Sequence, residues 1–218
     1  MLFPITIVDN FFEDPDYIVK FAKSLKYKDL DILPGSRTDA LHNIDKEFFN
    51  WITSKSLKLH YPQEDVSYEA EARFQKIPVN LKYDGWIHHD VPSELTCVIY
   101  LSTNADTGVS FYKRKSPMRI LNKQELKYHY FKDPNRNKKE MAEIEKAKKF
   151  NNNFFEETIN VKGVYNRCVL FDSSLYHAAH VFTGNEQKDD RLIFVNVIFS
   201  ISNNSKMLKY PVTECTRY

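Results

Sequence analysis

Three side chains that can bind a metal ion stand side by side in the stretch GWIHHDVP, residues 85–92. They are His88, His89 and Asp90. If this stretch is an extended strand, His88 and Asp90 point to one face and His89 points to the other. A histidine and a carboxylate on one face can bind the same divalent cation. Chance alone supplies about 0.5 His-x-Asp pairs in a chain of this composition, so the pair needs further support.

A third candidate ligand, His177, follows an apolar run in LFDSSLYHAAH. Strands far apart in a sequence can be neighbours in a barrel, so His177 can reach the His-x-Asp pair. Two histidines and one carboxylate form a facial triad with open coordination positions, which is typical of non-haem iron(II) oxygenases. His180 competes with His177, because the two point to opposite faces of an extended segment and at most one of them then binds the metal. The residues alone leave this choice open.

The elements that must position these residues are helices first and strands afterwards. Residues 2–8 predict a strand, and the N-cap and proline at Asp14-Pro15 predict a helix over 15–26. A turn at 33–36 and a second amphipathic helix over 45–59 are expected next. Short strands are then expected at 68–77, 86–90, 95–101, 109–112, 160–164, 168–172, 177–182 and 191–200. This order predicts an α+β protein built on an antiparallel barrel or sandwich.

One segment, residues 113–157, interrupts the strands and carries most of the positive charge. Between 113 and 149 there are 13 Lys or Arg and 5 Asp or Glu, a net charge of +8, whereas the whole chain carries +2. Asp133-Pro134 and the following NRNKKEMAEIEKAKKF predict a mostly solvated helix. We therefore expect a basic helical insertion, and the alternative is a lid or a docking surface for an acidic substrate.

Length and cysteine content restrict the class of protein. The 218 residues contain no linker rich in Pro, Gly or Ser, which predicts a single domain over 1–218. Cys97, Cys168 and Cys215 lack the spacing of a zinc site, so we expect reduced structural thiols. No stretch approaches the ~18 apolar residues of a membrane span, and the N-terminus lacks the features of a signal peptide. We expect a soluble cytoplasmic protein that does not bind membranes, and the sequence predicts no oligomeric state.

Several stretches together resemble the iron(II)/2-oxoglutarate-dependent dioxygenases, in particular their prolyl-4-hydroxylase-like branch with its bacterial and phage members. The segments WIHHD, VIYLS, TGVSFYKRK, YNRCVLFDSSLYHAAHVFTG and DDRLIFVNVIF occur in the order of that family, over about residues 68–200. IVDNFFEDPDYIVKFAKSL also resembles the family's N-terminal segment. The resemblance implies a double-stranded β-helix, a jelly-roll barrel of the cupin type, with supporting helices at the N-terminus.

The resemblance also implies roles for individual residues. His88, Asp90 and His177 match the iron ligands of the family, which favours His177 over the other candidate. Arg191 matches the basic residue that pairs with the distal carboxylate of 2-oxoglutarate, and its guanidinium suits a carboxylate. Tyr100 matches a tyrosine whose hydroxyl reaches the same cosubstrate.

The implied cofactors are Fe(II) and 2-oxoglutarate, with ascorbate as a candidate reductant. The implied reaction is hydroxylation of a small-molecule or peptide substrate, prolyl or other, coupled to decarboxylation of 2-oxoglutarate to succinate.

Other interpretations remain. A non-catalytic β-barrel interaction module could keep the fold and bind a metal without activity. The basic insertion could attract nucleic acid, as in oxidative demethylases, but those enzymes add a second arginine six positions after the first, where this chain has Val197. Arg191 could instead form a surface salt bridge with Asp189 or Asp190, and Tyr100 could be a core aromatic residue.

Overall fold

The computed structural model describes residues 4–29, 35–62, 66–78, 85–102, 107–115, 146–180 and 190–202. The N-terminal part contains the helices α1 (Pro15–Ser24), α2 (Leu41–Ile44) and α3 (Lys46–Leu57). The Asp14 carboxylate accepts a hydrogen bond from the backbone N–H of Tyr17, and Asp45 caps α3 in the same way. These caps satisfy N–H groups that a helix start leaves without a partner. The two predicted helices are confirmed.

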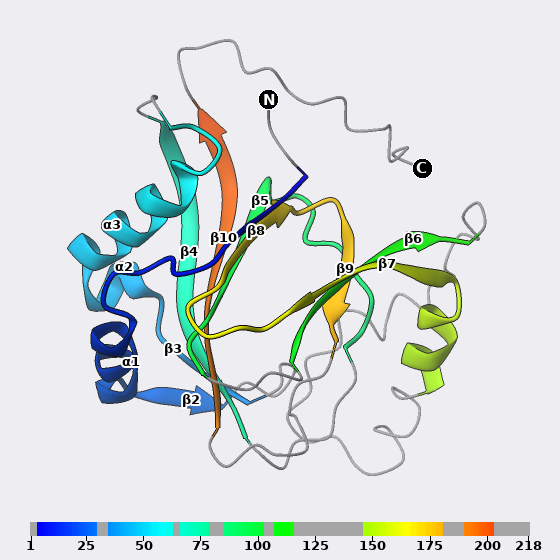
Figure 1. Ribbon diagram of the computed structural model, residues 1–218, viewed down its shortest axis with the longest axis horizontal. Coiled ribbons are helices and arrows are strands. Elements are labelled where there is room, and N and C mark those ends of the chain that lie inside the picture. Colours follow the sequence, from blue (N-terminus) through cyan, green and yellow to red (C-terminus); the bar gives the residue numbers. More distant parts are fainter. Residues whose placement is uncertain are drawn as a thin grey trace.

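Most of the described strands form one antiparallel sheet, and the rest form a second sheet (Figure 1). The larger sheet has the strand order β1-β8-β5-β10-β4-β3-β2. Its members are β1 (Ile5–Val8), β2 (Tyr27–Asp29), β3 (Ser36–Thr38), β4 (Ser67–Ile77), β5 (Leu95–Tyr100), β8 (Cys168–Asp172) and β10 (Arg191–Ser202). The smaller sheet has the order β7-β6-β9, with β6 (Gly108–Arg114), β7 (Phe155–Lys162) and β9 (Tyr176–Ala179). Antiparallel sheets with a few helices agree with the predicted class.

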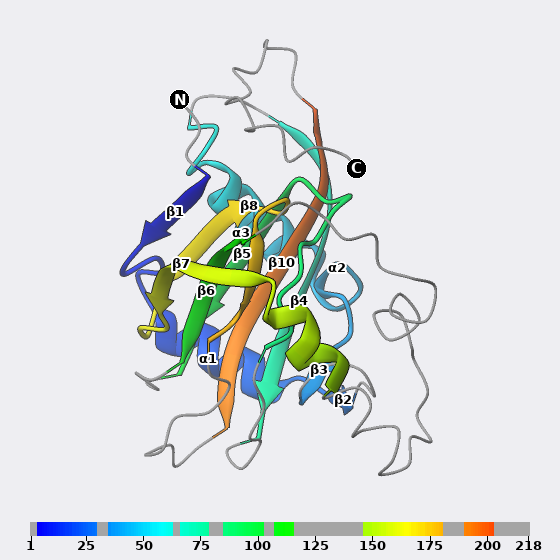
Figure 2. The same cartoon turned by 90° about the vertical axis from the view of Figure 1, so that its right-hand side faces the viewer.

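The two faces of the larger sheet have different partners. Helices α1, α2 and α3 lie against one face, and the smaller sheet lies toward the other (Figure 1 and Figure 2). Alternation along β10 sends Phe194 to the helix side, where it packs in a core with residues of α2 and α3. Ile193 faces the other way and packs with Tyr100 and with Phe111 of the smaller sheet. The face with Ile193 is called the inner face below.

Some sequence predictions fail or lie outside the described residues. Residues 86–90 are not a strand, because only His88 forms a β-bridge and the chain turns at Asp90, whose carbonyl accepts from the N–H of Ser93. Neither β2, β3 nor α2 was predicted, and β7 begins five residues before the predicted strand. Within the basic segment, residues 146–152 are helical. The predictions for 2–3, 33–34, 116–145 and 181–182 lie outside the described residues.

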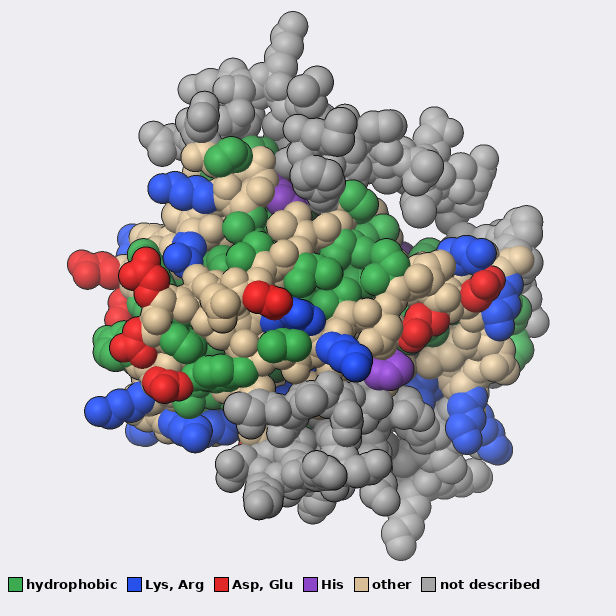
Figure 3. Space-filling view, in the orientation of Figure 1, with side chains coloured by type: hydrophobic (Ala, Val, Ile, Leu, Met, Phe, Trp, Pro, Cys, Tyr) green, Lys and Arg blue, Asp and Glu red, His purple; other side chains and the backbone are tan. Residues whose placement is uncertain are grey.

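None of the helices that the structure describes is long and apolar enough to span a bilayer. On the face shown in Figure 3, apolar side chains gather in the middle and charged side chains lie toward both sides. Cys97 and Cys168 are buried free thiols with their Sγ atoms 3.5 Å apart, as expected, and Cys215 lies outside the described residues.

Candidate metal centre

The side chains of His88, Asp90 and His177 converge on one point. Their candidate ligand atoms all lie within 4.8 Å of one another. Nε2 of His88 is 3.5 Å from Oδ1 of Asp90, and Nε2 of His177 is 3.4 Å from Oδ2. Ligands that share one ion at about 2.1 Å lie about 3 Å apart when they occupy neighbouring coordination positions. The three side chains therefore fit a single divalent cation with little adjustment.

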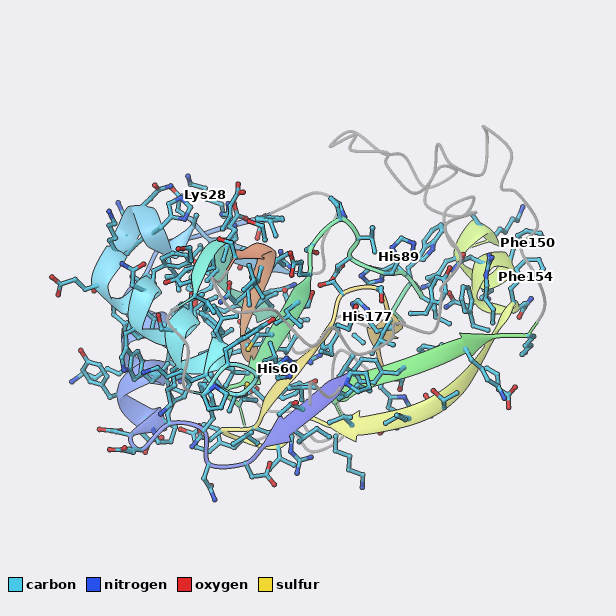
Figure 4. The ribbon with its side chains drawn as sticks, turned by 90° about the horizontal axis from the view of Figure 1, so that it is seen from above. Lys28, His60, His89, Phe150, Phe154 and His177 are labelled. Atoms are coloured by element: carbon cyan, nitrogen blue, oxygen red, sulfur yellow. The ribbon has the colours of Figure 1, made fainter. Side chains whose placement is uncertain are left out.

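Backbone hydrogen bonds hold the three residues in this arrangement. The N–H of His88 donates to the carbonyl of His177 at 3.0 Å, and the N–H of His177 donates back at 2.8 Å. The N–H of Asp90 donates to the carbonyl of Ser173 at 2.8 Å. The stretch 88–90 is thereby fixed against the end of β8 and the start of β9. Figure 4 shows His177 near the middle of the molecule, with His89 farther out.

The second nitrogen of each histidine ring sets the tautomer. Nδ1 of His88 is 2.6 Å from the carbonyl oxygen of Trp86, and Nδ1 of His177 is 2.9 Å from that of Leu175. A carbonyl oxygen can only accept, so each Nδ1 carries a proton, and in the neutral ring that binds a metal ion Nε2 then keeps its lone pair. Metal-binding histidines are commonly oriented by such a bond. Both Nε2 lone pairs are therefore available for a cation beside Asp90.

The carboxylate of Asp90 is held in its charged form. Burial acts to raise its pKa, but the imidazoles of His177 and His88 hold the pKa of Asp90 well below its usual range. The hydroxyl of Thr96 donates to Oδ2 of Asp90 at 2.8 Å and lies 2.9 Å from the hydroxyl of Ser173. Asp90 thus offers a negative, oriented oxygen at neutral pH.

The site is apolar on one side and open on the other. The ring of Phe171 lies 4.7 Å from that of His177, and the ring of Phe111 lies 6.4 Å from it. The side chain of His177 is 8% exposed, whereas that of His88 is 45% exposed. A ligand can therefore approach from the His88 side.

The competing histidines lie elsewhere. The ring of His89 is 5.4 Å from that of Tyr176, on the other side of the stretch from the cluster. Nδ1 of His180 is 3.2 Å from the hydroxyl of Ser110 and 3.6 Å from the carboxylate of Glu157. The structure therefore brings His177, and not His180, to the His-x-Asp pair.

Tyr100 and Arg191 are neighbours on the inner face. Cζ of Arg191 lies 5.4 Å from the ring centre of Tyr100. Arg191 is 2% exposed, so it is a buried side chain and not a surface one. Burial raises the pKa of Tyr100 to about 12, so its hydroxyl keeps its proton. Burial lowers the pKa of Arg191, while Tyr100 acts to raise it. The pair can donate hydrogen bonds to an anion.

Sequence reasoning missed three polar residues on the inner face of β3 and β4. They are Arg37, Arg73 and Gln75. Both nitrogens Nε and Nη2 of Arg37 donate to Oε1 of Gln75. The polar alternation along β4 was a signal for Arg73 and Gln75, but the three-residue strand β3 gave none for Arg37.

Comparisons with known proteins place the chain in a family. A family model described as "Family of unknown function (DUF6445)" matches residues 3–192. The chain belongs to this family. The match within DUF6445 includes the His-Asp-His cluster and Arg191. No curated protein matches the chain.

Solved structures show the fold of this DUF6445 member. HygX from Streptomyces hygroscopicus, solved with nickel and 2-oxoglutarate bound, has a TM-score of 0.54 at 11% identity, covering 89% of this chain and 82% of its own. The epimerase SnoN, in complex with Fe3+, alpha ketoglutarate and nogalamycin RO, has a TM-score of 0.54 at 11% identity, and the match covers 93% of this chain and 82% of SnoN. An oxidoreductase of the 2OG-Fe(II) oxygenase family from Burkholderia pseudomallei has a TM-score of 0.52 at 8% identity, and the match covers 89% of this chain and 84% of the oxidoreductase. At these identities the likeness shows a shared fold and no more.

Proposed function

We propose that this protein is an Fe(II)- and 2-oxoglutarate-dependent oxygenase. The observation that carries the proposal is the convergence of His88, Asp90 and His177, with both Nε2 atoms next to the carboxylate of Asp90. HygX was solved with nickel and 2-oxoglutarate, and SnoN with Fe3+ and alpha ketoglutarate. Their shared fold supports Fe(II) and 2-oxoglutarate as the cofactors of this chain.

The strand order supports a double-stranded β-helix. Strands β4, β10, β5 and β8 are consecutive neighbours in one sheet, and β7, β6 and β9 are neighbours in the other. The bridge between His88 and His177 extends the second sheet by one more position beyond β9. The cluster would thus lie at one end of a barrel made by two facing sheets, where substrates have access.

The residues of the site would have different roles, some binding the metal and others binding 2-oxoglutarate. His88, Asp90 and His177 would hold the iron on one face and leave the opposite positions for ligands. Arg191 and Tyr100 would hold the distal carboxylate of 2-oxoglutarate through charge-assisted hydrogen bonds.

Phe111 and Phe171 would exclude water beside His177. When bound, the two cofactors would supply the oxidation of the substrate, with release of succinate and carbon dioxide. We also propose that the reaction is hydroxylation of a small molecule or peptide, as in the prolyl-4-hydroxylase-like branch, with ascorbate as a candidate reductant. A single domain and a cytoplasmic location are proposed as well.

The test is succinate formation from 2-oxoglutarate by purified protein loaded with Fe(II), with oxygen present. We expect succinate from the wild type and from His89→Ala, and none above background from Asp90→Ala. His89→Ala is the matched control, because it removes a neighbouring imidazole that lies outside the cluster. Succinate at the same rate from the wild type and Asp90→Ala would show that this site does not carry the reaction.

A further inference from the structure

A second guanidinium, that of Arg37, lies on the inner face of the larger sheet, near its edge. Arg37 pairs with Gln75 across β3 and β4, and Gln75 pairs with Ile193 of β10. Directly paired residues share a face, so Arg37 lies on the inner face with Ile193 and Tyr100. The hydrogen bonds between the side chains of Arg37 and Gln75 agree with this placement.

Gln75 orients Arg37 and leaves part of it available. Nε and Nη2 of Arg37 donate to Oε1 of Gln75 at 3.2 and 3.0 Å, and Gln75 is only 3% exposed. A guanidinium has five N–H donors, so three remain, and two of these lie on the edge between Nη1 and Nη2. In the part of the chain that the structure describes, Arg37 forms no ion pair. The available edge has the geometry that binds a carboxylate through two parallel hydrogen bonds.

Two carboxylates near Arg37 are paired with another arginine. Nε of Arg73 is 2.7 Å from the carboxylate of Glu71, and Nη1 of Arg73 is 3.8 Å from that of Asp39. Burial lowers the pKa of Arg37 to about 10, and the charge of Arg73 acts in the same direction. The carboxylates of Glu71 and Asp90 act in the opposite direction. The metal centre lies on the same face as Arg37, because Thr96, whose hydroxyl donates to Oδ2 of Asp90, pairs with Val197, which has the same parity on β10 as Ile193.

We propose that Arg37 binds a carboxylate of the primary substrate and holds that substrate beside the metal centre. This inference rests on the proposed function. Arg37 is separate from the group assigned to 2-oxoglutarate, because Arg191 lies two strands and two residues away. The spacing of strands puts their Cα atoms roughly 12 Å apart. One guanidinium thus serves the cosubstrate and the other serves an anionic substrate, such as an amino acid or a peptide with a free C-terminus.

The test uses two probes of similar size, N-acetylglycine, which carries a carboxylate, and N-acetylglycinamide, which carries a neutral amide in its place. Their dissociation constants are measured by ligand-observed NMR on protein loaded with Zn(II), a redox-inert substitute, and saturating 2-oxoglutarate. We expect the wild type to bind the acid about tenfold more tightly than the amide, and Arg37→Gln to lose this preference. Arg37→Lys keeps the charge without the planar edge, so it should keep part of the preference. Lys113→Gln removes an exposed charge on β6 and should keep all of it.

Three results would overturn the inference. The wild type could bind the acid and the amide equally, it could bind neither probe, or the Arg37→Gln variant could still prefer the acid. Calorimetric titration of Zn(II) and 2-oxoglutarate separates this failure from that of the proposed function. If Arg37→Gln loses 2-oxoglutarate binding while Lys113→Gln retains it, Arg37 belongs to the cosubstrate site, and only the inference is wrong. If the wild type binds neither Zn(II) nor 2-oxoglutarate, the proposed function fails.

Discussion

His88 and His177 exchange two backbone hydrogen bonds, so that their imidazole rings lie 4.5 Å apart between centroids. The link is made by the main chain, and replacement of either ring leaves it in place. The positions of the two candidate ligands therefore depend on strand pairing and not on the metal. Variants of these side chains can test metal binding without removing the contact that joins the two segments.

Thr96 should tune metal affinity through Asp90. Its hydroxyl donates to Oδ2 of Asp90 and contributes to fixing the orientation of the carboxylate. Thr96→Val keeps the shape but removes the donor, so we expect metal affinity to fall about 10- to 100-fold. Thr96→Ser keeps the hydroxyl and should stay close to the wild type. Calorimetric titration with Zn(II) measures both variants, and equal affinities for Val and Ser would refute the role of this hydrogen bond.

Tyr100 should affect 2-oxoglutarate without affecting the metal. The hydroxyl is protonated at neutral pH, because burial raises the pKa of Tyr100 to about 12. Tyr100→Phe removes only this donor, and we expect 2-oxoglutarate to bind about tenfold more weakly. Metal affinity should not change. Titration of 2-oxoglutarate into Zn(II)-loaded protein gives the dissociation constant. An unchanged constant would leave Tyr100 as a core aromatic residue only.

The helix-side core should tolerate little loss of volume. Phe194 is fully buried on β10, with its ring centre 5.6 Å from that of Phe74. Phe194→Ala should lower the free energy of unfolding by about 3–5 kcal/mol, because it leaves a cavity. Phe199, on the same strand, is 42% exposed, and Phe199→Ala should cost only about 0.5 kcal/mol. Urea denaturation compares the two, and similar losses would contradict the assigned faces of β10.

His60 should make the fold sensitive to mild acid. Its Nε2 is 2.9 Å from the hydroxyl of Thr6, and burial lowers the pKa of His60 below 6.5, although Asp172 acts to raise it. The unfolded chain then binds a proton more readily than the folded one, so stability falls as pH drops below about 6.5. Thermal denaturation of the wild type and His60→Gln at pH 7.5 and 5.5 measures this. The variant should lose less stability between the two pH values; an equal loss would contradict the prediction.

Local signals predicted the helices and the shared side of His88 and Asp90, and the family resemblance favoured His177 as the third member of the cluster. The helix starts were found because Asp14 and Asp45 cap them through contacts three residues away. His88 and Asp90 were expected to share a side because alternation holds wherever a chain is extended, even though residues 86–90 form a single bridge and not a strand. The same alternation separated His177 from His180, which lies beside Ser110.

The inner face of β3 could not be predicted from the sequence. Arg37 lies in the strand SRT, which is too short and too polar to show an apolar alternation. Its position depends on pairing with Gln75, a residue 38 positions away, and such long-range pairing leaves no local signal. The burial of Arg191 could also not be predicted from its neighbours in the sequence, because two aspartates precede it and suggest an exposed salt bridge.

Anaerobic calorimetry with Fe(II) followed by 2-oxoglutarate tests the central claim most directly. The wild type should bind one Fe(II) per chain, and 2-oxoglutarate should then bind to the iron-loaded form but only weakly to the metal-free form. His88→Ala should lose iron binding and His89→Ala should retain it, because only His88 belongs to the cluster. Absence of iron binding by the wild type, or 2-oxoglutarate binding that is equal with and without the metal, would contradict the account.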